Sequence, residues 1–168
     1  MEVDVYLIGL SLSPAALGSA KLWKSQGKFC DSLAKALLQK QTPKIFGDVD
    51  QTHVSVTLKF MRSVSKTQMI QAFDDALLGC DKDALADFNL ALNECIDKEK
   101  GLQKGDVLTF HWPKGGGLVV SSSRHISSGI ENLGLAERLL EVYVDDSRTV
   151  STDLVNCIKD NIDQIDAV

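Results

Sequence analysis

The chain has 168 residues, of which 44% are hydrophobic and 24% charged, and it carries a formal net charge of −5. This composition is typical of one globular domain, residues 1–168, which is large enough to bury a core without a disulfide or metal. The basic residues are scattered, which argues against a nucleic-acid-binding surface. No run of about 18 apolar residues is present, so we expect no membrane span.

The N-terminal residues and the cysteines bear on compartment. The acidic start at Glu2 and Asp4 differs from the basic start of a secretory signal. The four cysteines show no CxxC spacing, and Cys30, Cys95 and Cys157 fall near apolar helix faces, where we expect small core side chains. We therefore expect an intracellular protein in a reducing compartment, cytoplasmic or, in a eukaryote, in a plastid.

The first elements are a strand and a helix. The segment "EVDVYLIGLSL" begins with alternation and becomes continuously apolar, which predicts a well-buried strand over 3–12, ended by Ser13 and Pro14. The next periodic stretch, 27–41, places Leu33 and Leu37 on one helical face, and Pro43 prevents its simple continuation.

The segment 52–79 changes its hydrophobic period partway through. "THVSVTLKF" alternates as a half-buried strand does, whereas Met69, Phe73 and Leu77 repeat at helical spacing. Ser65 and Gln68 are three residues apart and predict a capping box where the helix begins. The segment therefore predicts a strand that leads directly into a helix.

The remaining chain predicts three helices and a hairpin. A helix is expected over 82–99 with Asp81 as its N-cap, followed by two strands joined through "PKGGG". Helices over 130–144 and 151–165 follow, the last with Ser151 as its cap. Antiparallel strands interleaved with helices predict an α+β fold, an antiparallel sheet covered on one face by helices.

Few residues indicate chemistry directly. The glycines of "PKGGG" precede a strand, so a hairpin turn is favoured over a phosphate loop. The three histidines lack the spacing of a metal site, and we expect neither a metal nor a cofactor. Residue types alone leave a Ser-His-Asp site open, although no GxSxG motif is present. Arg62, between a strand and a helix, is a candidate to pair with an anionic ligand at the mouth of a pocket.

Four segments, in their order and spacing, resemble the chalcone isomerase fold family. These are "VDVYLIGLSLSP", "LKFMRSVSKTQMIQAFDDAL", "KGDVLTFHWPKGGG" and "IENLGLAERLLEVYV", which together extend over most of the chain. The resemblance implies a chalcone isomerase-like open-faced sandwich with a ligand cleft between sheet and helices. The family includes chalcone–flavanone isomerases, fatty-acid-binding relatives and non-catalytic helpers of flavonoid synthesis.

The resemblance also bears on catalysis. The tyrosine, asparagine and serine or threonine positions of the isomerases fall on Met69, Ala76 and Ala136, and their arginine and threonine belong to strands at or before "EVDVYL". Methionine and alanine side chains offer no strong donor to a developing enolate. We therefore expect a non-catalytic protein whose cleft is lined by hydrocarbon and sulfur, with nothing to stabilise negative charge on an oxygen.

The sequence thus predicts a protein that binds a small apolar or amphipathic ligand, fatty-acid-like or flavonoid-like. The fatty-acid-binding members hold a carboxylate with an arginine and a tyrosine, and only Arg62, at a different place, offers a substitute here. Two alternatives stay open, a chalcone–flavanone isomerase and a protein-interaction helper of a biosynthetic enzyme. The expected cleft residues are Met69, Phe73, Ala76, Ala136, Leu140 and Arg62.

Overall fold

The computed structural model describes residues 5–25, 33–38, 52–127, 129–145 and 152–162. These residues form six helices and one four-stranded antiparallel sheet in the order β1-β2-β3-β4. In chain order the elements are β1 (Tyr6–Leu12), α1 (Pro14–Ser25), α2 (Leu33–Leu38), β2 (Thr52–Phe60), α3 (Lys66–Ala76), α4 (Lys82–Cys95), β3 (Val107–Pro113), β4 (Val119–Ser122), α5 (Leu133–Val144) and α6 (Thr152–Asn161). No helix in these ranges is long and apolar enough to cross a membrane.

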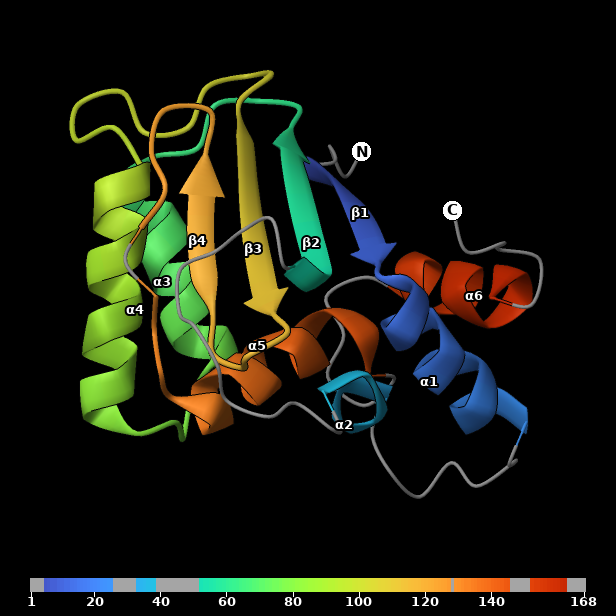
Figure 1. Cartoon of the computed structure of the whole chain (residues 1–168). Helices are drawn as coiled ribbons and strands as arrows, with labels where there is room; N and C mark the ends of the chain where they lie inside the picture. The colour runs from blue at the N-terminus through green and yellow to red at the C-terminus, as the bar shows by residue number, and fades with distance from the viewer. Residues whose placement is uncertain (1–4, 26–32, 39–51, 128, 146–151, 163–168) are drawn as a thin grey trace.

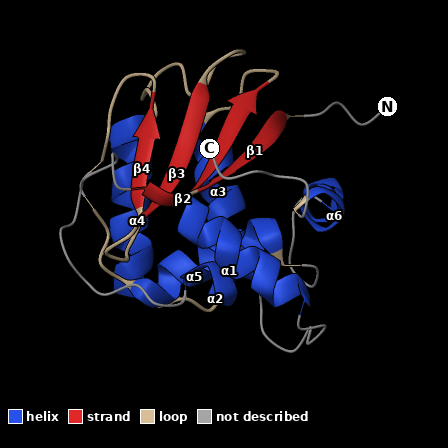
Figure 2. Cartoon of the chain, turned by 45° about the vertical axis from the view of Figure 1, so that its right-hand side comes forward, coloured by secondary structure: helices blue, strands red, loops and turns tan. Residues whose placement is uncertain are grey.

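Helices α3, α4 and α5 cover one face of the sheet, and α1, α2 and α6 lie around its lower end in Figure 1 (Figures 1 and 2). The alternation of β2 explains this arrangement, because Val54, Val56, Leu58 and Phe60 are fully buried while Lys59 is exposed. Helices α3, α4 and α5 lie behind the strands in Figure 1 and bury their apolar faces against them. The predicted α+β architecture, an antiparallel sheet with helices on one face, is confirmed.

Aromatic rings fill the centre of this interface. The Phe110 ring packs edge-on against Phe73 at a centroid distance of 5.3 Å and stacks with Tyr143 at 6.1 Å, and Phe88 packs edge-on against Phe73. Such pairs contribute about 0.5–1.5 kcal/mol beyond the burial of their surface. The Trp112 indole N–H donates to the Ala136 carbonyl at 2.8 Å, which ties α5 to β3. The core therefore holds α3 and α5 in fixed positions against the sheet.

The predicted hairpin is confirmed. β3 and β4 pair from Leu108↔Ser122 to His111↔Val119, and the connecting turn places Gly116 and Gly117 at positive φ. That region of φ is open to glycine at little cost, which explains the glycine run. The capping box at Ser65 is also confirmed. The Gln68 backbone N–H donates to Ser65 Oγ at 3.2 Å, and the Ser65 backbone N–H donates to Gln68 Oε1 at 3.1 Å.

The prediction of a well-buried first strand is wrong. β1 lies at the edge of the described sheet, paired only with β2 from Tyr6↔Phe60 to Leu12↔Val54. Alternate side chains are only partly buried, and Leu7 on the other face is 53% exposed. The apolar run was a poor guide because an edge strand is covered on fewer sides than a central one. Residues 3 and 4 of the predicted strand lie outside the described residues.

Helix α1 was not predicted. It follows β1 without a loop, and the Ser13 hydroxyl caps it by accepting from the Ala16 amide at 3.2 Å. Pro14 occupies the first helical position, where its missing N–H costs nothing. Ala16, Leu17 and Ala20 form its buried stripe. Ser13 and Pro14 end the strand, as predicted, and they also begin this helix.

Other predicted boundaries differ for local reasons. α4 ends at Cys95 and not at residue 99, because the Asp97 carboxylate accepts from the amides of Glu99 and Lys100 and closes a turn. α5 begins at Leu133, three residues later than predicted, after the Asn132 side chain caps the Leu135 amide.

Some predictions lie partly or wholly outside the described residues. The ends of the predicted helices over 27–41 and 151–165, the Ser151 cap and Cys30 belong to this group. Among the other cysteines, Cys95 is a buried core residue as predicted, whereas Cys157 is exposed and the core assignment for it is wrong.

Candidate functional site

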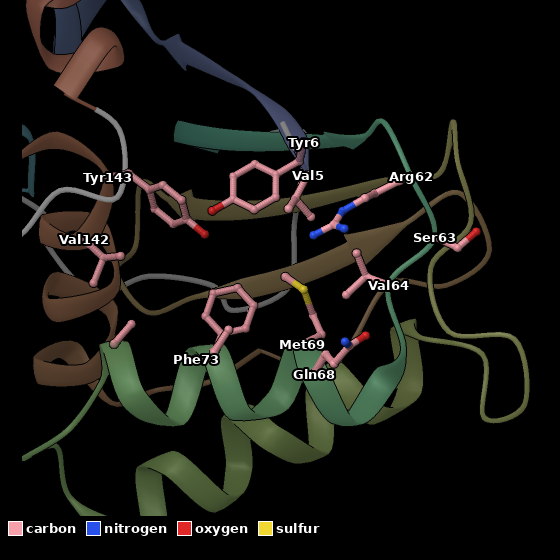
Figure 3. A pocket seen from close by; sticks show the side chains of 12 residues that line it. Val5, Tyr6, Arg62, Ser63, Val64, Gln68, Met69, Phe73, Val142 and Tyr143 are labelled. Carbon is pink, nitrogen blue, oxygen red and sulfur yellow. The ribbon is translucent and has the colours of Figure 1, made fainter. Parts of the chain in front are cut away.

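A cavity of about 300 Å³ lies between β1, α3 and the C-terminal end of α5 (Figure 3). This volume is at the small end of the range typical of small-molecule sites. Its walls come from the start of β1, the segment between β2 and α3, one face of α3 and the last turn of α5. The lining residues are Val5, Tyr6, Arg62, Ser63, Val64, Gln68, Met69, Ala72, Phe73, Ala76, Val142 and Tyr143.

Helix α3 supplies the apolar floor. The capping box fixes where the helix begins, so that Met69 and Phe73, one turn apart, both face the sheet and are buried. Ala76 follows on the same face and is half-buried, while Ala72 and Gln68 are exposed at the edge of the cavity. The strand-to-helix corner identified in the sequence is therefore one wall of the cavity.

Arg62 lies at one end of the cavity, and its guanidinium extends over it (Figure 3). In the part of the chain that the structure describes, no carboxylate pairs with Arg62. The segment that carries it is held by a two-way backbone pairing, in which the Val64 amide donates to the Leu102 carbonyl at 2.8 Å and the Leu102 amide donates to Val64 at 2.9 Å. The arginine is thus anchored to a fixed backbone and presents its charge to the cavity.

Two tyrosines face the same space. Tyr6 on β1 and Tyr143 on α5 turn their hydroxyls toward one another (Figure 3). Burial raises the pKa of Tyr143 well above its usual range, with a smaller contribution from Tyr6, and burial also raises the pKa of Tyr6. Both hydroxyls therefore stay protonated at neutral pH and are hydrogen-bond donors. The expectation of a cleft lined only by hydrocarbon and sulfur is wrong.

The predicted cleft residues fall into two groups. Arg62, Met69, Phe73 and Ala76 all line the cavity. Ala136 and Leu140 are buried in the core but are not among its lining residues. The Ala136 carbonyl instead receives the Trp112 indole N–H, which places this turn of α5 against β3.

Sequence reasoning missed Tyr6, Tyr143 and Val142 as cavity residues. Tyr143 follows Ala136 and Leu140 at helical spacing, so the same pattern that selected those two residues extends to it one turn later. Tyr6 gave a weaker signal, because its place opposite Phe60 depends on the register of β1 against β2. The Tyr6 and Phe60 rings meet edge-on at 5.9 Å and fix that side chain at the cavity wall.

A serine–histidine pair lies elsewhere, where β1 meets α1. The His53 Nε2–H donates to the Leu37 carbonyl at 3.0 Å, so Nδ1 is the ring nitrogen that accepts from the Ser13 hydroxyl at 2.8 Å. The same hydroxyl caps α1. No aspartate of the described residues hydrogen-bonds with this pair, so these residues do not form a Ser-His-Asp site. Because His53 is buried and joins β2, α1 and α2, the pair has a structural role.

This tie predicts a pH dependence of stability. Burial, and to a lesser extent Lys114, lowers the pKa of His53 below its usual 6.5, against the opposing effect of the Leu37 carbonyl. The unfolded chain takes up the proton first, so stability is fully present above about pH 6.5 and is lost as pH falls through the folded value. Urea unfolding measures the free energy of unfolding at each pH. As the pH falls, this free energy should decrease less steeply in His53→Gln than in wild type or in the control His125→Gln. Equal slopes in all three would contradict the assignment.

Comparison with known proteins places the fold. No protein-family model and no curated protein sequence matches the chain. Among solved structures, a fatty-acid binding protein of Arabidopsis thaliana matches with a TM-score of 0.68 at 13% identity, over 95% of this chain and 79% of that one. That protein is a chalcone isomerase-like family member. At this identity the match concerns the fold, and the chain accordingly has the chalcone isomerase-like α+β fold that its sequence predicted.

Proposed function

We propose that this chain binds a small amphipathic anion in the cavity between β1, α3 and α5. The apolar part of the ligand packs against Met69, Phe73 and Val142, and its negatively charged group pairs with Arg62. The observation that carries the proposal is the position of the Arg62 guanidinium, which extends over a largely apolar cavity (Figure 3). Apolar walls with a few convergent polar groups are the usual composition of a small-molecule site.

The charge of the cavity favours an acid over a neutral lipid. Arginine is protonated at every physiological pH and its planar fork matches a carboxylate. No acidic side chain of the described residues lines the cavity, so a bound carboxylate meets no like charge among these lining residues. The fatty-acid binding protein of Arabidopsis with the same fold supports a fatty acid as the ligand class. The small volume favours a short or medium chain over a long one.

An isomerase remains the second candidate, because the two tyrosine hydroxyls supply donors where the sequence had suggested none. Donors aimed at a carbonyl oxygen are what an enolate-forming reaction needs. Stereoselective conversion of naringenin chalcone above its spontaneous rate would favour this candidate. The helper role predicts a stoichiometric complex with an enzyme. Three leucines on the helical side are exposed, Leu78, Leu90 and Leu133, but they come from different elements and do not by themselves define one docking surface.

The proposal is tested by melting the protein with octanoate, decanoate and palmitate. A ligand at about one hundred times its Kd stabilises the folded state by about 2.7 kcal/mol, which raises the melting temperature by roughly 5–10 °C for a chain of this size. Ala76→Leu, which fills part of the cavity, should abolish most of the shift. Ala86→Leu, an exposed alanine on α4, is the matched control and should keep it. No shift with any acid, together with no co-purified ligand in native mass spectrometry, would reject the proposal.

A further inference from the structure

The polar groups of the cavity lie at two separate places. The Arg62 guanidinium lies on one side of the Tyr6 ring, and the Tyr6 hydroxyl points the other way, toward Tyr143 (Figure 3). The smaller contribution of Tyr6 to the raised pKa of Tyr143 agrees with this arrangement. A single carboxylate held by all three side chains would need them to converge on one point. Here they diverge, with Met69 and Phe73 facing the space below (Figure 3).

The hydroxyl end is rigid. Tyr6 packs edge-on against Phe60, and Tyr143 stacks on Phe110 at 6.1 Å with an angle of 29° between the rings. Tyr143 is only 2% exposed. Neither ring can swing toward Arg62 without losing these contacts and leaving a gap in the core. The two hydroxyls are thus held in place before any ligand arrives.

The Tyr6 hydroxyl has no hydrogen-bond partner among the described residues. Tyr6 is half-buried and its hydroxyl borders the cavity, so this oxygen is open to a hydrogen bond with water or with a ligand. A ligand that carries an oxygen at this position can take the place of water and pair with the Tyr6 hydroxyl. A plain hydrocarbon tail would meet the hydroxyl and satisfy none of its bonding capacity.

From this arrangement, and resting on the proposed function, we infer that the ligand is bifunctional. It carries an anionic group for Arg62 and, at a separate position, an oxygen that hydrogen-bonds with Tyr6 and Tyr143. The chemical class is an oxygenated acid, such as a hydroxy or oxo fatty acid or a hydroxylated aromatic acid, and not an unsubstituted fatty acid. The tyrosine pair is then what selects between the two.

The test compares matched pairs of ligands by calorimetry. Hexanoate, octanoate and decanoate are each measured against their ω-hydroxy forms, and phenylpropionate against its para-hydroxy form. For at least one pair the oxygenated acid should bind wild type about tenfold tighter, since one buried hydrogen bond is worth about 1.4 kcal/mol at that ratio. In Tyr6→Phe the preference should vanish or reverse, because the ligand hydroxyl then enters without its partner.

Three controls keep the outcomes distinct. Tyr143→Phe should also reduce the preference, while Thr57→Val, which removes a hydroxyl from the sheet outside the cavity, should leave it unchanged. The melting temperature of each variant without ligand shows whether it is folded. If plain acids bind wild type as tightly as every oxygenated form, the bifunctional ligand is rejected and the proposed function stands. If no acid of either kind binds, both are rejected.

Discussion

Replacing Arg62 by glutamine is expected to weaken the binding of octanoate or decanoate by about tenfold to a hundredfold. A hydrogen bond to a charged group is worth about 1.5–3 kcal/mol, and every 1.4 kcal/mol is a tenfold change in Kd. The effect should be large because, among the residues that the structure describes, Arg62 is the one cation that lines the cavity. Isothermal calorimetry at low and high salt measures it, and the wild-type affinity should fall with salt while that of Arg62→Gln should not.

The specificity of this effect is checked on both partners. Arg124→Gln removes an arginine that pairs with Asp97 at 2.9 Å away from the cavity, and it should leave the affinity unchanged. Wild type should prefer decanoate over decanol, and Arg62→Gln should lose that preference. Arg62→Lys should restore part of it, since lysine keeps the charge without the planar fork. An unchanged affinity in Arg62→Gln would remove the arginine from the site.

Gly101→Ala is expected to destabilise the fold by about 2–4 kcal/mol. Gly101 has a φ of +62°, where an L residue costs about 1–2 kcal/mol. In addition, a Cβ at this position would overlap the Val64 carbonyl oxygen and lie 3.0 Å from Ser65 Cα, so the backbone must move. Chemical denaturation measures the loss.

Gly105→Ala is the matched control for this substitution. Gly105 also has positive φ, +93°, but a Cβ there meets nothing within 4 Å, so only the conformational cost of about 1–2 kcal/mol remains. Gly101→Ala should also weaken octanoate binding more than Gly105→Ala does, because Val64 is held by the Leu102 pairing and lies two residues from Arg62. Equal losses of stability in both variants would show that the contact with the Val64 carbonyl does not contribute to the effect.

Local patterns predicted the elements that depend on neighbours in sequence. The Ser65 and Gln68 pair located the start of α3, and helical spacing placed Met69 and Phe73 on its inward face. Arg62 was identified from its place between a strand and a helix. Each of these features depends only on residues close to it in the chain, so a single sequence is enough to predict it.

The tyrosine end of the cavity required information that the sequence does not hold locally. Tyr6 and Tyr143 are separated by almost the whole chain, and they meet because β1 pairs with β2 while α5 packs against β3, the next strand of the sheet. The family resemblance located the turn of α5 that carries Ala136 and Leu140, but that turn packs against Trp112 and the next one reaches the cavity. Packing between distant segments decided which turn faces the ligand.

The position of β1 at the border of the sheet has a consequence for how the cavity opens. A strand with a single hydrogen-bonded neighbour in the described sheet separates more easily than a central one, and this strand carries Val5 and Tyr6. A ligand that contacts both β1 and α3 holds them together, so its binding free energy also stabilises the strand against local opening. Ligand binding and local opening of β1 are then thermodynamically linked. Amide hydrogen exchange along this strand should therefore slow when a ligand fills the cavity.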